Sequence, residues 1–222
     1  PSRQDDPTKA RQMSPTLKAS LWMIGAIASF SSMAVAGREV SAAHDTFEIM
    51  MYRSLIGLII VAVLLTVTRS WHQVTRRSLG IHTVRNVAHF AGQNLWFYAV
   101  TVIPLAQVFA LEFTSPLWVV VLSPLVLGER LTGVRVISAL IGFAGILIVA
   151  RPGAESLNTG IITAATAAIF FAVTITLTKK LTRTETIACI LFWLTAMQLV
   201  LGVVFAGYDG HVTLPNAQTG PW

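Results

Sequence analysis

The sequence predicts an all-α polytopic membrane protein, and three observations support this fold class. Of the 222 residues, 54% are hydrophobic and only 12% are charged, and the mean hydropathy is +0.68. Apolar stretches of about 20 residues recur along the chain, and a helix of that length crosses the roughly 30 Å hydrocarbon core of a bilayer. The positively charged residues fall in alternate connections between these stretches, as in a chain that crosses a membrane back and forth.

Seven apolar stretches are long enough to span the membrane as helices. They are residues 17–36, 48–67, 84–103, 105–127, 132–150, 159–178 and 187–206. The third stretch is the least apolar, because it contains His89, Gln93 and Asn94. Only the Ile103-Pro104 turn separates the third stretch from the fourth, so we expect these two helices to be antiparallel neighbours.

The distribution of Lys and Arg predicts the orientation. Thirteen of the 16 lie on one side, in residues 1–18, 69–85, 130–135 and 179–183, whereas Arg38 and Arg151 lie on the other side. Because positively charged connections stay in the cytoplasm, the N-terminal tail, residues 1–16, should be cytoplasmic. We expect the lipid bilayer of a bacterial inner membrane to surround the helices.

Composition and motifs exclude several function classes. A net charge of +6 would suggest a nucleic-acid partner in a soluble protein, but here the cations fix orientation, so we expect no such partner. The single cysteine, Cys189, excludes an internal disulfide. The sequence contains no P-loop, HExxH, GxSxG or Cys/His metal spacing. We therefore expect no enzymatic activity, no cofactor and no metal.

The fourth stretch carries the most informative residues. It contains Glu112 about 12 Å below its start at Pro104, and the prolines Pro116 and Pro124. A charge at that depth costs about 2.5–3.5 kcal/mol and usually faces a partner or a water-filled cavity. Pro116 cannot bond the carbonyl of Glu112, so a carboxylate and a freed acceptor would share one level. The alternative is a proline kink satisfied by Ser115 or Thr114, with Glu112 in a structural ion pair.

Arg53 in the second stretch should lie at a depth similar to that of Glu112, since both helices enter from the outside. We hypothesise that Arg53 and Glu112 pair across the cavity, because pairing explains how both are tolerated. The alternative is that Arg53 extends to the outer interface, towards Glu48.

The third stretch carries a polar stripe, with Arg85, His89 and Gln93 at intervals of four residues. Amide and aromatic side chains near mid-depth favour a planar polar substrate, through hydrogen bonds and stacking. The alternative is hydrogen bonding between helices. The candidate site residues on these grounds are Gln93, Asn94, Trp96 and Tyr98, with Gln198 of the last stretch.

Glu129 follows Gly128 in the connection after the fourth stretch. An acid near the start of the next helix complements the helix dipole, which favours a structural role for Glu129 over a gating role.

An internal repeat links the two ends of the chain. At an offset of 140 residues, Phe30 aligns with Phe170, Tyr52 with Phe192, and the Asp45-Thr46 pair with Glu185-Thr186. A repeat of five helices is odd in number, so the second copy would cross the membrane with inverted topology, as in many secondary transporters. The alternative is a chance likeness of two membrane hairpins.

These residues resemble the EamA domain of the drug/metabolite transporter superfamily. The resemblance is carried by Tyr98-Ala99, Pro104, Pro116, Leu127-Gly128-Glu129-Arg130 and Arg151-Pro152-Gly153. It implies a first EamA repeat at 17–151, a linker at 152–158 and an incomplete second repeat at 159–222. The chain would thus supply seven helices of a ten-helix, 5+5 inverted-repeat fold and be a truncated transporter.

The function expected from the resemblance is secondary-active transport of small polar metabolites or drugs by alternating access. Glu112 is a candidate proton carrier in that cycle. The alternatives are a passive exchanger with a structural Glu112, or a membrane scaffold that transports nothing. The expected partners are a small-molecule substrate and, as a candidate, a second copy in a homodimer.

Overall fold

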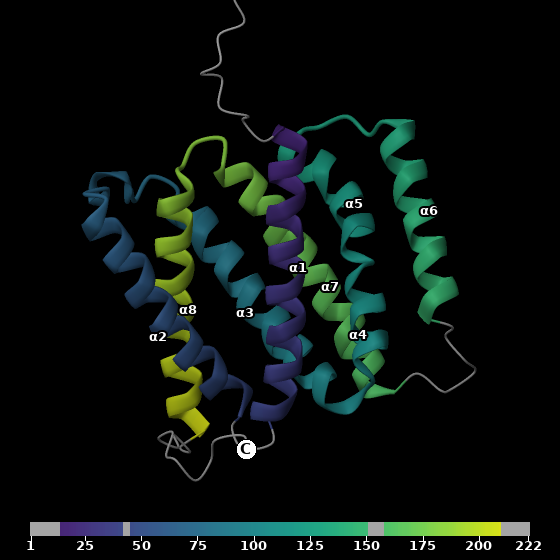
Figure 1. Ribbon diagram of the computed structural model, residues 1–222, viewed down its shortest axis with the longest axis horizontal. Helices are drawn as coiled ribbons and strands as arrows, with labels where there is room; N and C mark the ends of the chain where they lie inside the picture. Colours follow the sequence, from purple (N-terminus) through teal and green to yellow (C-terminus); the bar gives the residue numbers. More distant parts are fainter. Residues whose placement is uncertain (1–13, 42–44, 151–157, 210–222) are drawn as a thin grey trace, which may run out of the picture. The chain divides into compact units, whose positions relative to one another are not determined.

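The computed structural model describes residues 14–41, 45–150 and 158–209, and these residues form helices joined by short connections, with no strand among them (Figure 1). The chain divides into two units, Pro1–Ala36 and Gly37–Trp222. The predicted linker at 152–158, except its last residue, most of the tail at 1–16 and the end of the chain after 209 lie outside the described residues.

The first unit consists of most of helix α1, Pro15–Val40. The hydroxyl of Ser14 accepts a hydrogen bond from the backbone N–H of Leu17 at 3.2 Å, which satisfies one of the donors left unpaired at a helix start. Large apolar side chains of α1 are exposed, among them Trp22 at 74%. Such a surface is suited to contact with lipid or another apolar helix.

The described residues of the second unit form the end of α1 and seven further α-helices. Their bounds are Thr46–Val67 (α2), Leu79–Val102 (α3), Leu105–Glu112 (α4), Ser115–Leu127 (α5), Gly133–Ala150 (α6), Thr159–Leu181 (α7) and Ile187–Asp209 (α8). A short 3₁₀ turn, Trp71–Gln73, precedes α3. Each predicted membrane span is therefore confirmed as helix, although α3 begins five residues earlier than the sequence predicts.

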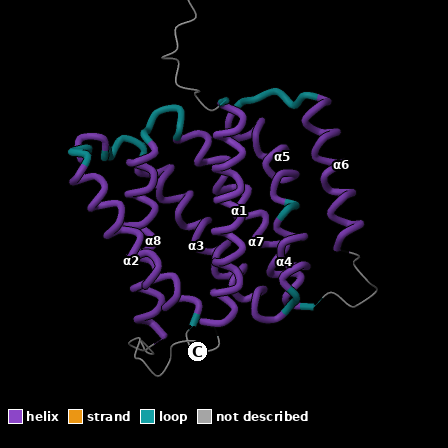
Figure 2. Tube along the Cα trace, in the orientation of Figure 1, coloured by secondary structure: helices purple, strands orange, loops and turns teal. Residues whose placement is uncertain are grey.

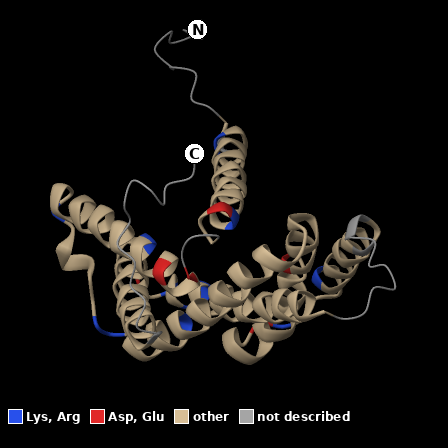
Figure 3. Ribbon diagram, turned by 90° about the horizontal axis from the view of Figure 1, so that it is seen from below, with Lys and Arg blue, Asp and Glu red and all other residues tan. Residues whose placement is uncertain are grey.

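Five described helical segments are long and apolar enough to cross a membrane: Thr16–Val40, Thr46–Val67, Leu105–Leu127, Thr159–Leu181 and Ile187–Tyr208. Charged residues are sparse along the helices, whose ribbons are mostly uncharged (Figure 3). These findings agree with the predicted all-α polytopic membrane protein. Helix α3 falls outside the apolar group because of its polar stripe.

Two helix pairs build the second unit: α2 packs on α8, and α3 packs on α7, which also contacts α4 and α5 (Figures 1 and 2). Gly202 permits the first pair to approach closely, because a β-carbon there would lie 2.9 Å from the Cα of Met51. Gly92 does the same for α3 and α7, where a β-carbon would lie 3.0 Å from that of Phe170. Small residues at such crossings let membrane helices pack backbone to backbone.

The fourth predicted span is broken into two helices, with the break at Phe113 and Thr114 (Figure 2). Pro116 therefore lies in the first turn of α5, where its missing N–H costs little, and does not kink a continuous helix. The hydroxyl of Ser115 donates to the carbonyl of Glu112 at 2.6 Å. The acceptor that we expected Pro116 to leave free is thus satisfied by Ser115, the alternative named above.

The helix bounds agree with the 140-residue repeat. Shifting α2 by 140 residues gives 186–207, and α8 is Ile187–Asp209. These two helices also pack on each other. The two-repeat organisation itself stays a prediction.

Candidate functional site

A mostly buried polar stripe lies on α3, the helix that packs against both α7 and α8. It comprises His82, Arg85, His89, Gln93 and Trp96, which follow one another at intervals of three or four residues, as on one face of a helix. Four of the five are buried, and His89 is half-buried. The predicted stripe of Arg85, His89 and Gln93 is thus one face of α3, and it extends further in both directions.

Several buried polar atoms of this region have no hydrogen-bond partner among the described residues. On α3 they are both ring nitrogens of His82, Nδ1 of His89, Oε1 of Gln93 and Oδ1 of Asn94. Oε1 of Gln198 on α8 belongs to the same group. A buried polar group without a partner costs about 1–3 kcal/mol, so such a cluster indicates a place for water or a polar ligand.

The chemistry of two of these atoms is fixed by their neighbours. The Nε2 of Gln198 donates to the carbonyl of Asn86 at 2.8 Å, and the Nδ2 of Asn94 donates to the carbonyl of Phe90 at 2.8 Å. Because a backbone carbonyl only accepts hydrogen bonds, the amide nitrogen and oxygen of each side chain cannot exchange places. The remaining atoms of Gln198 and Asn94 are therefore acceptors and require a donor.

Asn86 is a residue that sequence reasoning missed. Its side chain accepts from Arg85 at 3.1 Å and donates to the carbonyl of Trp193 at 3.2 Å, and it is 1% exposed. Its carbonyl also holds Gln198, so Asn86 links α3 to α8. The sequence could have indicated Asn86, because it is a polar residue directly after Arg85 in the same polar segment of α3.

Glu112 lies at the end of α4, and its carboxylate accepts a hydrogen bond from Nε1 of Trp96 at 2.7 Å. The structure thus brings together two predicted site residues whose pairing was not predicted. Donation from an indole to a carboxylate is a charge-assisted hydrogen bond, one of the stronger kinds. This hydrogen bond connects the turn that breaks the fourth span to the C-terminal end of the α3 stripe.

Arg53 lies on α2, and Glu112 lies at the end of α4. Helix α2 packs mainly on α8, whereas α4 packs on α7 and α6. The pairing of Arg53 with Glu112 stays a prediction.

Two predicted residues do not join the stripe. Tyr98 is 42% exposed, because a position two residues after Trp96 lies about 200° round the helix. Asn94 is half-buried and bonded to its own helix, and it also lies to one side of the stripe. Tyr98 therefore points away from the face that carries Trp96, and its part in a substrate pathway stays a prediction.

Glu129, which precedes α6, contacts three cationic side chains. Its carboxylate lies 2.9 Å from Arg135 and 2.8 Å from both Lys179 and Arg183, which follow about 50 residues later in the chain. Hydrogen bonds from Lys179 and then Arg135 hold the pKa of the Glu129 carboxyl below its ordinary value. The sequence predicted only that Glu129 complements the dipole of α6, and did not predict its contacts with Lys179 and Arg183.

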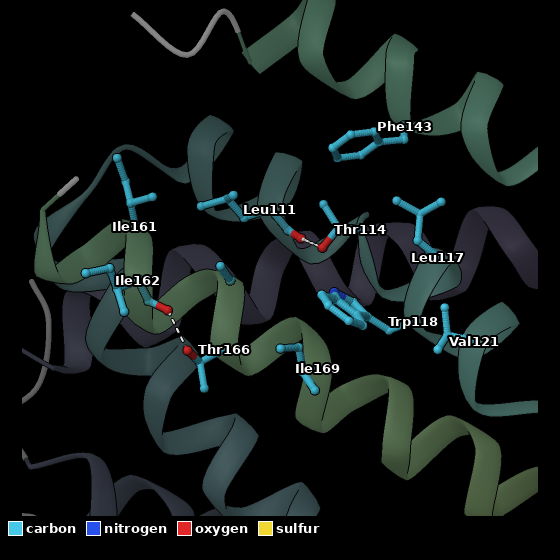
Figure 4. Close-up of a pocket in the computed structure, with 11 residues that line it drawn as sticks. Leu111, Thr114, Leu117, Trp118, Val121, Phe143, Ile161, Ile162, Thr166 and Ile169 are labelled. Atoms are coloured by element: carbon cyan, nitrogen blue, oxygen red, sulfur yellow. Dashed lines mark hydrogen bonds between the residues drawn. The ribbon is translucent and has the colours of Figure 1, made fainter. Parts of the chain in front are cut away.

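A separate apolar groove of about 560 Å³ lies between the broken span, α6 and α7 (Figure 4). The hydroxyl of Thr114 donates to the carbonyl of Leu111, and that of Thr166 to the carbonyl of Ile162, so both hydroxyls are satisfied by nearby backbone. The lining includes none of the predicted site residues. This groove offers little to a polar solute, so the polar stripe is the better candidate site.

Comparison with protein families places this geometry in context. Residues 17–151 match the sequence profile of the EamA-like transporter family. A riboflavin transporter of Brucella anthropi is 31% identical over 77% of this chain and 61% of its own length. An S-adenosylmethionine uptake transporter of Rickettsia conorii is 24% identical over 83% of this chain and 63% of its own.

Two further similarities agree with these. A pseudopaline exporter of Pseudomonas aeruginosa is 31% identical over 56% of this chain and 43% of its own length. A crystal structure of a protein superposes with a TM-score of 0.62 at 19% identity, over 85% of this chain and 66% of that one, and supports the fold alone. The chain spans about three fifths of the length of the transporters named first.

Proposed function

The chain belongs to the EamA-like transporter family, and from that premise we propose that it forms part of a secondary carrier for small polar molecules. The carrier works by alternating access around the buried stripe of α3. Its N-terminus and the connections rich in Lys and Arg lie in the cytoplasm, as the positive-inside rule predicts, and the membrane is a bacterial inner membrane.

The observation that carries the proposal is the set of buried polar atoms without partners in an otherwise apolar bundle. Gln93, Gln198 and Asn94 each present a carbonyl oxygen, and His89 presents a ring nitrogen. Polar groups are costly in the membrane interior unless they serve a solute pathway or pair with one another. The oxygens call for a ligand rich in N–H or O–H donors.

The relatives support the same substrate class. Riboflavin and S-adenosylmethionine, named for two of them, both contain a nitrogen heterocycle and several donors. A planar ring of this kind suits amide hydrogen bonds and stacking on an aromatic side chain such as Trp96. We therefore favour substrates with a planar nitrogen heterocycle.

Glu112 has two candidate roles, and they make different predictions. As the proton carrier of the cycle, Glu112 would exchange a proton for the substrate near mid-depth. The hydrogen bond from Trp96 favours the alternative, in which Glu112 is structural and the protein is a passive exchanger. Uptake into vesicles with and without a pH gradient separates these roles, because Glu112→Gln abolishes only gradient-driven uptake in the first case and leaves it unchanged in the second.

The transport proposal is tested with radiolabelled riboflavin and S-adenosylmethionine as probes. Vesicles containing the protein should take up at least one probe, and Gln93→Leu should reduce that uptake at least about tenfold, as expected for loss of one buried polar contact. Val87→Leu is the matched control, because Val87 lies on the exposed face of the same helix. Equal uptake with and without the protein for both probes would instead favour a scaffold or a different substrate class.

A further inference from the structure

One end of the second unit is held together by polar contacts between segments far apart in the sequence. The connection before α3, residues 68–78, and the connection after α5, residues 128–132, both contact the corner where α7 meets α8 (Figure 1). The first two segments belong to the first repeat and the corner belongs to the second. In the proposed orientation this is the cytoplasmic end.

Thr75 makes the first set of contacts with all of its polar groups. Its hydroxyl donates to the carboxylate of Glu185 at 2.6 Å, and its carbonyl accepts from Nε1 of Trp193 at 2.7 Å. Its backbone N–H points to the sulfur of Cys189 at 3.4 Å. The hydrogen bond from Thr75 is the main reason that the pKa of the Glu185 carboxyl lies below its ordinary value.

Glu129 makes the second set of contacts, on the other side of the corner. Lys179 and Arg183, from the end of α7 and the turn after it, each lie 2.8 Å from its carboxylate. Arg183 also approaches the carbonyl of Leu127, the last residue of α5, at 3.5 Å. Two separate connections of the first repeat are thus fastened to one corner of the second.

Near Thr75, some buried polar atoms have no hydrogen-bond partner among the described residues. His82 is fully buried, and neither of its ring nitrogens has a hydrogen-bond partner among the described residues. Oε1 of Glu185 is also buried and has no hydrogen-bond partner among these residues. Water would satisfy these atoms if the corner moved away, so desolvation works against the closed arrangement and keeps it releasable.

We propose that these contacts form a clasp that closes the cytoplasmic end of the carrier and must release in each transport cycle. The clasp comprises Thr75, Glu129, Lys179, Arg183, Glu185 and Trp193. The inference rests on the proposed function, because it assigns the clasp to one step of alternating access. Its release would open a route along the α3 stripe, which begins at His82 beside the clasp and leads inward to Gln93.

Cys189 provides a reporter that does not depend on transport. It is the only cysteine in the 222 residues and is fully buried beside Thr75. A maleimide applied from the cytoplasmic side should label it only when the clasp opens. Thr75→Val, which keeps the shape and removes the hydroxyl, should raise the labelling rate at least about tenfold, as expected for loss of a hydrogen bond to a carboxylate.

Two control variants sharpen this measurement. Thr75→Ser retains the hydroxyl and should label at the rate of the unaltered protein. Glu129→Gln should increase labelling as Thr75→Val does, whereas Glu39→Gln, an exposed acid at the other end of the unit, should not. Equal labelling rates in Thr75→Val, Glu129→Gln and the unaltered protein would overturn the clasp, whatever the outcome of the transport assays.

A crosslink tests whether release is required for transport. The hydroxyl oxygen of Thr75 lies 3.9 Å from the sulfur of Cys189, so Thr75→Cys places two sulfurs within reach of a disulfide. Oxidation with copper phenanthroline should stop uptake of the probe, and dithiothreitol should restore it, whereas oxidation should not affect Thr75→Cys with Cys189→Ala. Continued uptake by the crosslinked protein would refute the inference, while absence of uptake in the reduced protein would count against the proposed function itself.

Discussion

Replacing Gly202 with alanine should force α2 and α8 apart. The added β-carbon would lie 2.9 Å from the Cα of Met51 and 3.1 Å from its backbone nitrogen. Carbon atoms pack best at about 3.5–4.0 Å, so α8 has to move by roughly 0.6 Å or more. The obstacle is the backbone of α2, which cannot rotate away as a side chain could, so the whole interface loses contact. Overpacking of this kind costs about 1–3 kcal/mol.

Gly207→Ala is the matched control for this substitution. Gly207 lies in the same helix, and a β-carbon there would meet nothing within 4 Å. Both variants gain the same helix propensity, so the difference between them isolates the packing cost. In detergent, the melting temperature of Gly202→Ala should lie about 2–12 °C below that of Gly207→Ala. Equal melting temperatures would show that the α2–α8 contact is looser than the structure indicates.

Three further predictions concern the broken span and the charged corner. Ser115→Ala removes the donor to the carbonyl of Glu112 and should lower stability by about 1–3 kcal/mol, seen as a lower melting temperature; no change would mean that another donor replaces the hydroxyl. Trp96→Phe keeps the ring and removes the indole donor, so a double-mutant cycle with Glu112→Gln should give a coupling of about 1.5–3 kcal/mol, and additive effects would argue against the bond. Glu129→Gln tests pH dependence: because Lys179 and Arg135 hold the folded-state pKa of this carboxyl below 4.5, its stabilising contribution is present above pH 4.5 and is lost as the pH falls below that value. The melting temperature of Glu129→Gln should therefore fall less on acidification than that of the unaltered protein, and parallel curves would contradict the reasoning.

The sequence by itself determined the fold class and the positions of the helices. Hydropathy and length locate helices in a bilayer because a spanning helix must satisfy its backbone internally and match the hydrocarbon thickness. The same reasoning drew attention to Pro116 and named Ser115 as a group able to satisfy the freed carbonyl, but it treated the fourth span as one helix where the structure has two. These features depend on local composition, which a sequence contains in full.

The partners of the site residues were decided only by the tertiary structure. Period alone put Arg85, His89 and Gln93 on one face of α3, but it could not give Glu112 its contact with Trp96, because that contact depends on how α4 packs beside α3. Tyr98 was grouped with Trp96 although the helix turns the two apart. The clasp at Thr75 and Glu129 left no local signal, since it joins residues 50 to 118 positions apart. Side chains meet across helices according to crossing angle and depth, and only the packed structure fixes both.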